Sequence, residues 1–212
     1  YGDHPYARRS DGTVESLSSV TVDDLHNLHE RTFARGKLSV AVVGAIDAEM
    51  LKAELDRLFG DLPAEPNLVD VPKASLNLDQ ELTYAYPLPQ STIQLVYPGL
   101  ERDDPEFFAA FLMNHVLGGG TFSSRLHNEV REKRGLTYGV GSGLQTSDAV
   151  DMLYIGLSTN PDKAKEAIEV IREEIRKIVE DGVTDEELAT AKTYLIGAYP
   201  INNLDSSGAV AR

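Results

Sequence analysis

The chain has 212 residues, of which 42% are hydrophobic and 25% charged, enough for one large domain or two small ones with a hydrophobic core. Its formal net charge of −14 argues against nucleic acid and anionic membranes as partners, because an acidic surface repels phosphate. The absence of cysteine excludes disulfides, thiolate metal sites and cysteine nucleophiles. No apolar run reaches the roughly 20 residues that cross a bilayer, so no membrane span is expected.

The first 65 residues alternate between helix and strand patterns. Thr21 begins a capping box, in which its hydroxyl accepts from an early N–H of the helix that follows. The run Leu38–Ile46 is rich in Val and Ile and predicts a buried strand. Asp47 is expected to cap a further helix that ends at Gly60.

Three prolines in residues 61–78 interrupt any periodicity, and we predict a linker over residues 66–78. Strands, paired helices, strands and paired helices then follow in that order. This order predicts an α+β fold, with helices packed on one face of a mostly antiparallel sheet. The four expected strands are Glu81–Tyr86, Thr92–Tyr97, Tyr138–Gln145 and Asp151–Thr159. The expected helix starts are Asp104-Pro105, Thr121 or Ser123, Asn160-Pro161 and Thr184.

His26 and His29 lie within the run His-Asn-Leu-His-Glu. It resembles the His-x-x-Glu-His of inverted zinc peptidases with its last two residues exchanged. A catalytic zinc takes three protein ligands and a water, and no third ligand is evident. The alternative is that both are partly exposed helix histidines.

Gly118, Gly119 and Gly120 follow a helix rather than a strand, and no Lys-Ser or Lys-Thr comes after them. This placement argues against a phosphate cradle. Two interpretations stay open: a turn between helices, or a loop that approaches an extended substrate closely because glycine has no side chain.

Arg131 and Tyr138 lie seven residues apart, on a predicted helix and at the start of the next predicted strand. Both donate hydrogen bonds and neither readily changes charge near neutral pH, which suits the binding of peptide carbonyls or developing negative charge. The alternative is a solvated basic cluster of Arg131, Lys133 and Arg134 beside a tyrosine at the edge of the core.

The stretch from Leu117 to Gly143, with Ser-Ser-Arg-Leu followed by Val-Arg-Glu-Lys-Arg-Gly-Leu-Thr-Tyr, resembles the second half of pitrilysin/insulinase-type (M16) zinc peptidases. Earlier runs resemble the late part of the preceding half of that family. These runs are His4-Pro5-Tyr6, Asp11 to Glu15, Leu38 to Asp47 and Phe59 to Pro63.

The resemblance implies a LuxS/MPP-like metallohydrolase-type architecture, in which two α+β halves face each other around a chamber. One half holds zinc through His-x-x-Glu-His and a downstream Glu, and the other supplies an Arg and a Tyr that contact substrate. It implies a substrate-holding role for Arg131 and Tyr138, and more weakly for Gly118, Gly119 and Gly120. His-x-x-Glu-His occurs nowhere in this chain, so neither catalytic nor metal-binding residues are expected here.

The resemblance also implies a domain assignment. Residues 1–65 would be the late part of a preceding half, and residues 79–212 most of the inactive, substrate-holding domain. The expected partners are peptide or unfolded polypeptide and a zinc-bearing half, in the same chain or in a second subunit. Bacterial members of the family are often exported to the periplasm. Two other functions stay open: a structural assembly subunit, and an independent metal hydrolase that uses His26 and His29.

Overall fold

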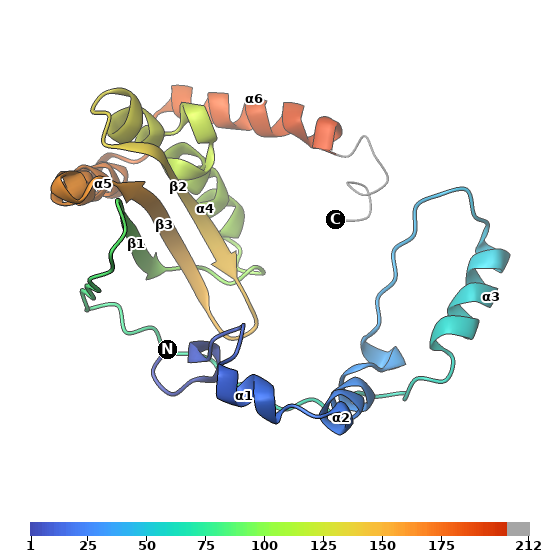
Figure 1. Ribbon diagram of the computed structural model, residues 1–212. Helices are drawn as coiled ribbons and strands as arrows, with labels where there is room; N and C mark the ends of the chain where they lie inside the picture. Colours follow the sequence, from blue (N-terminus) through green and yellow to red (C-terminus); the bar gives the residue numbers. More distant parts are fainter. Residues whose placement is uncertain (203–212) are drawn as a thin grey trace. The chain divides into compact units, whose positions relative to one another are not determined.

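The computed structural model describes residues 1–202 (Figure 1). Residues 203–212, the end of the predicted inactive domain, lie outside the described residues. Contacts divide the chain into one compact unit of residues 73–197 and a second unit that contains residues 1–72. Each unit is described by itself.

Residues 73–197 contain an antiparallel three-stranded sheet in the order β1-β3-β2. Strands β2 and β3 form a hairpin, in which Ser147 Oγ donates to the carbonyl of Val150 across the turn at 2.7 Å. The register of β2 against β3 shifts between Thr137 and Val140, which marks a bulge at the start of β2. The strands are β1 (Ser91–Pro98), β2 (Thr137–Thr146) and β3 (Asp151–Thr159), which confirms three of the four strands predicted after the linker.

Helices cover one face of this sheet, as Figure 1 shows for α4 and α5. The core is made by Leu117, Leu126 and Val130 from the helical layer and by Ile155 and Leu157 from β3, with Ala167 and Ile171 of α5. The α+β prediction is therefore confirmed. The helices are α4 (Phe107–Asn114), α5 (Ala164–Asp181) and α6 (Asp185–Asn202).

Two of the predicted helix starts are wrong, whereas the capping contacts predicted ahead of α5 and α6 form. Helix α4 begins at Phe107, after Glu106 and without a side-chain cap, rather than at Asp104-Pro105. The helix predicted from Thr121 or Ser123 begins at Arg125, after a 3₁₀ turn over Thr121–Ser123.

The Asn160 side chain accepts from the Asp162 N–H ahead of α5, at 3.0 Å. Gly182 ends α5 with a φ of 76°, a conformation that other residues rarely adopt. Thr184 and Glu187 exchange hydrogen bonds in a capping box that begins α6.

Two π-helical segments separate α4 from β2. The first, η3 (His115–Gly119), continues α4 and is closed by the Gly120 N–H donating to the His115 carbonyl at 2.8 Å. The second, η5 (His127–Glu132), is closed by the Lys133 N–H on the Asn128 carbonyl at 2.9 Å. Both bonds span five residues instead of the four of an α-helix.

Residues 1–72 form three short α-helices whose starts match their capping residues. Thr13 and Thr21 each make a capping box, and the Asp47 carboxylate accepts from the Met50 N–H at 2.8 Å. The helices are α1 (Val14–Ser19), α2 (Val22–Thr32) and α3 (Ala48–Phe59), with 3₁₀ turns at Pro5–Ala7 and Arg35–Lys37.

Two predicted strands are absent from residues 1–202. Leu38–Ile46 has no strand pairing, and Val40 and Val43 are 46% and 49% exposed. Glu81–Tyr86 is likewise unpaired, with Tyr84 82% exposed. The prediction was wrong for a physical reason: an apolar run becomes a strand only where a neighbouring strand satisfies its backbone, and neither run has one here.

Residues 1–72 also lack a hydrophobic core. Within this range Ala34 is the one buried residue, while Leu25, Leu28 and Phe33 of the α2 region are more than half exposed. Separately, none of the helices in residues 1–202 combines the length and the apolar character that a membrane span requires.

Candidate functional site

The predicted substrate-binding residues fall on the two π-helical segments and at the start of β2. Gly118 and Gly119 end η3, Arg131 lies in η5, and Tyr138 is the second residue of β2. π-Helical turns are rare and occur frequently at functional sites. The unusual backbone thus coincides with the stretch that the sequence singles out.

Gly118 allows the helical layer to lie directly against the sheet. A Cβ on this buried glycine would lie 2.5 Å from Ser142 Oγ and 2.8 Å from the Ser142 backbone nitrogen. Ser142 Oγ in turn donates to Asn114 Oδ1 at 2.7 Å, which links β2 to the end of α4. The missing side chain therefore serves the packing of η3 on β2.

The other two glycines differ from each other in exposure. Gly120 is buried, and a Cβ there would lie 2.6 Å from the His115 carbonyl oxygen. Gly119 is exposed. Of the three, Gly119 alone presents backbone at the surface, while Gly118 and Gly120 hold the turn in shape.

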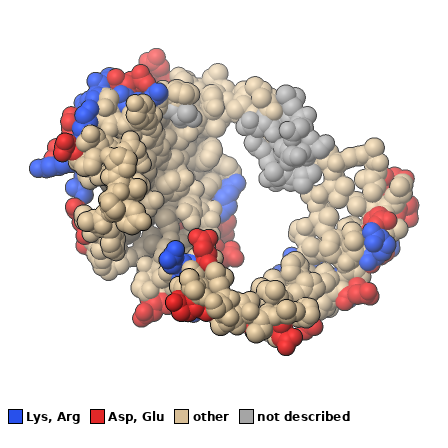
Figure 2. Space-filling view, viewed as in Figure 1, with Lys and Arg blue, Asp and Glu red and all other residues tan. Residues whose placement is uncertain are grey.

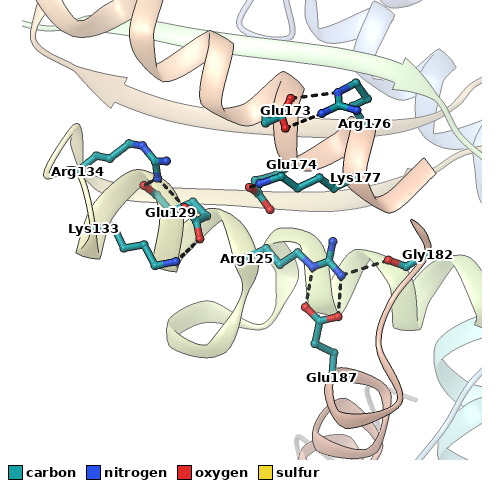
Figure 3. Close-up of polar contacts among 10 residues, drawn as sticks. All are labelled: Arg125, Glu129, Lys133, Arg134, Glu173, Glu174, Arg176, Lys177, Gly182 and Glu187. Carbon is teal, nitrogen blue, oxygen red and sulfur yellow. Dashed lines mark hydrogen bonds and ion pairs between the residues drawn. The ribbon is translucent and has the colours of Figure 1, made fainter. Parts of the chain in front are cut away.

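Arg131 has other partners than Lys133 and Arg134, which Figure 3 shows beside Glu129. Lys133 and Arg134 both pair with Glu129, at 2.5 and 2.6 Å. The hydrogen bonds from Lys133 and then Arg134 lower the pKa of Glu129. The charges of Lys133 and Arg134 are therefore neutralised by Glu129. Arg131 does not share this partner, so the three cations do not form one uniform basic cluster.

The Arg131 side chain is 35% exposed and contacts a different set of groups. Its Nη1 lies 2.7 Å from His127 Nε2 and 3.1 Å from Glu132 Oε1. Its guanidinium carbon lies 5.9 Å from the centre of the Phe122 ring, within cation–π range. This arrangement holds one edge of the guanidinium and leaves part of it at the surface.

A turn fixes the path from Arg131 to Tyr138. The Gly135 N–H donates to the Arg131 carbonyl and the Leu136 N–H to the Val130 carbonyl, both at 2.9 Å. Gly135 adopts a φ of 57°, in the left-handed region that favours glycine. Among residues 1–202 no hydrogen bond joins Arg131 to Tyr138, so their relation is set by this backbone turn.

Tyr138 is 89% exposed and borders a groove of about 320 Å³ on the sheet. The other side chains and glycines around it are uncharged, among them Gln90, Thr92, Gln94, Gly156 and Ser158. Asp151 is the one charged residue in all three strands. Figure 2 shows the same contrast: charged side chains gather over the helices, and the surface over β1 and β3 is mostly uncharged.

His127 is a site residue that the sequence analysis did not identify. Its side chain is 8% exposed, and its ring meets Phe122 edge-on with 5.0 Å between centroids. The spacing of His127 and Arg131, four residues apart on a predicted helix, was the available signal.

His26 and His29 lie on α2 and are exposed. Within residues 1–202, no three histidine, aspartate or glutamate side chains are grouped so that they could hold a metal ion. The described residues thus offer no ligand set that fits the zinc of an M16 peptidase.

The sequence model of the Peptidase M16 inactive domain matches residues 19–195. The chain belongs to the M16 peptidase family. Within that family it corresponds to the inactive domain, the half without catalytic function. The functional expectations drawn from Arg131 and Tyr138 thus concern an M16 inactive domain.

Individual M16 relatives agree with this assignment. A protein of Mycobacterium leprae named as an uncharacterized zinc protease is 31% identical over 218 residues, covering 100% of this chain and 48% of its own length. A Helicobacter pylori protein named as a non-peptidase homolog is 26% identical over 96% of this chain and 47% of its own. The crystal structure of an M16 inactive domain from Pseudomonas fluorescens superposes with a TM-score of 0.81 at 34% identity, over 93% of this chain and 48% of that one.

This M16 chain therefore spans about half the length of the curated relatives it matches. Their names include both a zinc protease and a non-peptidase.

Proposed function

We propose that this inactive M16 domain holds extended peptide for a zinc-bearing M16 half, located in the same chain or in a partner subunit. Arg131 and Tyr138 donate hydrogen bonds to the peptide, and Gly118 keeps the π-helical segment η3 close to the sheet. The supporting observation is that Arg131, whose carboxylate partner Glu132 is itself 56% exposed, keeps part of its guanidinium at the surface, while Tyr138 stands 89% exposed at an uncharged groove.

The chemistry of these groups fits peptide better than a charged ligand. A peptide backbone is neutral and rich in carbonyl acceptors, and both Arg and Tyr side chains offer donors. The groove beside Tyr138 has no cation or anion in its lining, so an ionised ligand side chain there would lose hydration without gaining a counterion. The domain is thus expected to accept neutral side chains at this position.

The direct test is a fluorescence anisotropy titration of a labelled extended peptide against the 212-residue chain. Arg131→Ala removes a charged donor, worth about 1.5–3 kcal/mol, and should raise Kd about 10- to 100-fold. Arg134→Ala is the matched control, because Arg134 is already engaged by Glu129. Equal Kd values for wild type and Arg131→Ala would refute the role.

A second test concerns catalysis by the assembled protein. The chain is combined with a zinc-bearing M16 half, and peptide cleavage is compared between wild type and Arg131→Ala. Positioning of the peptide by this domain predicts a slower rate for the variant. An unchanged cleavage rate would count against a substrate-holding role.

An assembly subunit without proteolytic role is the second candidate, favoured by the Helicobacter pylori relative named as a non-peptidase homolog. In that case changes at Arg131 and Tyr138 would be silent. Changes on the Phe107–Phe111 face of α4, where Phe108 is 65% exposed, would disrupt folding or assembly instead. Gel filtration of Phe108→Ala in the complete protein separates the two candidates.

We further propose that residues 1–65 complete a preceding α+β half. The support is the exposed, strand-forming run Leu38–Ile46, together with relatives about twice as long as this chain. A strand from that half would pair with this run and cover its apolar side chains. Hydrogen exchange of the amides of residues 38–46 should slow when the upstream half is co-expressed, and unchanged exchange would refute the pairing.

A further inference from the structure

We propose that His127 is the positioning residue of Arg131: its Nε2 lone pair sets the direction in which the guanidinium meets peptide. This inference rests on the proposed substrate-holding role of Arg131 and adds the group that prepares it. It follows from the contacts, burial and hydrogen-bonding state of His127.

The contact between the two side chains fixes the tautomer of the histidine. Arg131 Nη1 lies 2.7 Å from His127 Nε2, and a guanidinium can only donate. His127 Nε2 therefore accepts, which requires a neutral ring with its proton on Nδ1. That Nδ1 is shielded from solvent and has no hydrogen-bond partner among the described residues.

A buried N–H without an acceptor costs free energy, and native structures contain few such groups. Packing alone does not call for it here. The ring already meets Phe122 edge-on, a contact that a phenylalanine would make without any polar atom. What an imidazole adds over a phenyl ring at this position is the acceptor for Arg131.

The other groups near Arg131 are less able to orient it. Glu132 Oε1 is 3.1 Å from Arg131 Nη1, but the Glu132 side chain is 56% exposed and its attraction is screened by water. His127, in contrast, is 8% exposed and fixed on η5. A buried acceptor holds one edge of the guanidinium and leaves its remaining N–H groups for carbonyl oxygens of the peptide.

Two variants separate the acceptor from the ring. His127→Phe keeps an aromatic ring against Phe122 and removes the acceptor, whereas His127→Gln keeps an acceptor on a shorter, non-aromatic side chain. In the peptide titration, His127→Phe should raise Kd about tenfold while its thermal midpoint stays level or rises. His127→Gln should restore most of the binding. Parallel loss of binding and stability in His127→Phe would overturn the inference, because it would indicate a merely structural role.

A double-mutant cycle then tests the route of the effect. If His127 acts through Arg131, His127→Phe should not weaken binding further in the Arg131→Ala background. An additive loss overturns the inference. If Arg131→Ala itself has no effect, the proposed function fails; if Arg131→Ala weakens binding and His127→Phe does not, only the positioning role fails.

The ring ¹⁵N spectrum of the 212-residue chain provides a readout independent of any ligand. The neutral ring of His127 should show a protonated Nδ1 and an unprotonated Nε2, with the Nε2 resonance changing in Arg131→Ala. A protonated Nε2, or an Nε2 resonance unaffected by Arg131→Ala, would overturn the inference whatever the binding data show.

Discussion

The pair of Arg125 and Glu187 joins the helical stretch that carries the site to the start of α6. Arg125 Nε donates to Glu187 Oε1 at 2.6 Å and Arg125 Nη2 to Oε2 at 2.7 Å, a two-pronged contact (Figure 3). Arg125 Nη2 also reaches the Gly182 carbonyl at 3.1 Å. We predict that Glu187→Gln, which keeps the shape and removes the charge, destabilises residues 73–197.

The magnitude follows from the pKa of the carboxylate. Hydrogen bonds from Arg125, and then from Thr184, lower the pKa of Glu187 to about 2. An unfolded glutamate has a pKa of about 4.3, and one pH unit of difference is worth 1.36 kcal/mol, giving about 3 kcal/mol. Because the Glu187 side chain is 30% exposed, screening reduces the expected loss to about 2 kcal/mol at neutral pH.

The sign of the pH dependence is also defined. The lowered pKa contributes stability that is present above the unfolded pKa and is lost as pH falls from about 5 toward 2. The free energy of unfolding of wild type and Glu187→Gln should therefore differ at pH 7 and converge in acid. Urea unfolding followed by circular dichroism, repeated across this pH range, measures the difference.

The control is Glu173→Gln, which breaks the contact of Glu173 with Arg176 on the exposed face of α5. Exposed ion pairs contribute little, so this variant should unfold close to wild type. Equal stability of Glu187→Gln and Glu173→Gln, or a difference that persists unchanged to pH 2, would refute the reasoning.

Three further predictions concern packing, the groove and metal. Gly118→Ala should lower the free energy of unfolding by about 1–3 kcal/mol, since its Cβ would lie 2.8 Å from the β2 backbone, whereas Gly139→Ala, with nothing within 4 Å, should not. Gly156→Val should weaken peptide binding, because the new side chain fills the groove. Its thermal stability should stay level, because a Cβ at Gly156 meets nothing within 4 Å and β-branched residues suit strands. An unchanged peptide Kd would exclude the groove as the place where peptide binds. Plasma emission analysis of the zinc-treated, dialysed chain should find no stoichiometric metal, and zinc that disappears in a His26→Ala/His29→Ala variant would revive the metal hydrolase.

The sequence predicted those elements whose stabilising contacts lie close along the chain or within the unit of residues 73–197. The caps at Thr21 and Asp47, and that of Asn160 on the 3₁₀ turn Pro161–Lys163 ahead of α5, were predictable because a cap is a contact between near neighbours. Strand β1 was predictable from alternation, since its residues are exposed and partly buried in turn. Leu38–Ile46 was not, because an apolar run carries no information about whether its partner strand is present.

The site itself was only partly accessible to sequence reasoning. Arg131 and Tyr138 were found through a family resemblance, and the structure adds the groove beside Tyr138 and the division of charge around Arg131. The π-helical turns were not predictable, because a hydrogen bond spanning five residues leaves no distinct pattern of polar and apolar positions. His127 was not predictable, because a histidine four residues from an arginine on a helix carries no sign in the sequence that its ring is buried against the guanidinium.

Several features of residues 73–197 that are unfavourable for the free energy of folding lie in one short stretch. It contains two π-helical turns, a glycine whose Cβ has no room, and a buried imidazole N–H without an acceptor. A helical layer that only covered a sheet would be more stable as regular α-helix with apolar side chains. Local departures of this kind are expected where they prepare a binding group, and Arg131 is a partly exposed group that this stretch holds in place. The location of the cost therefore favours the substrate-holding role over the assembly role.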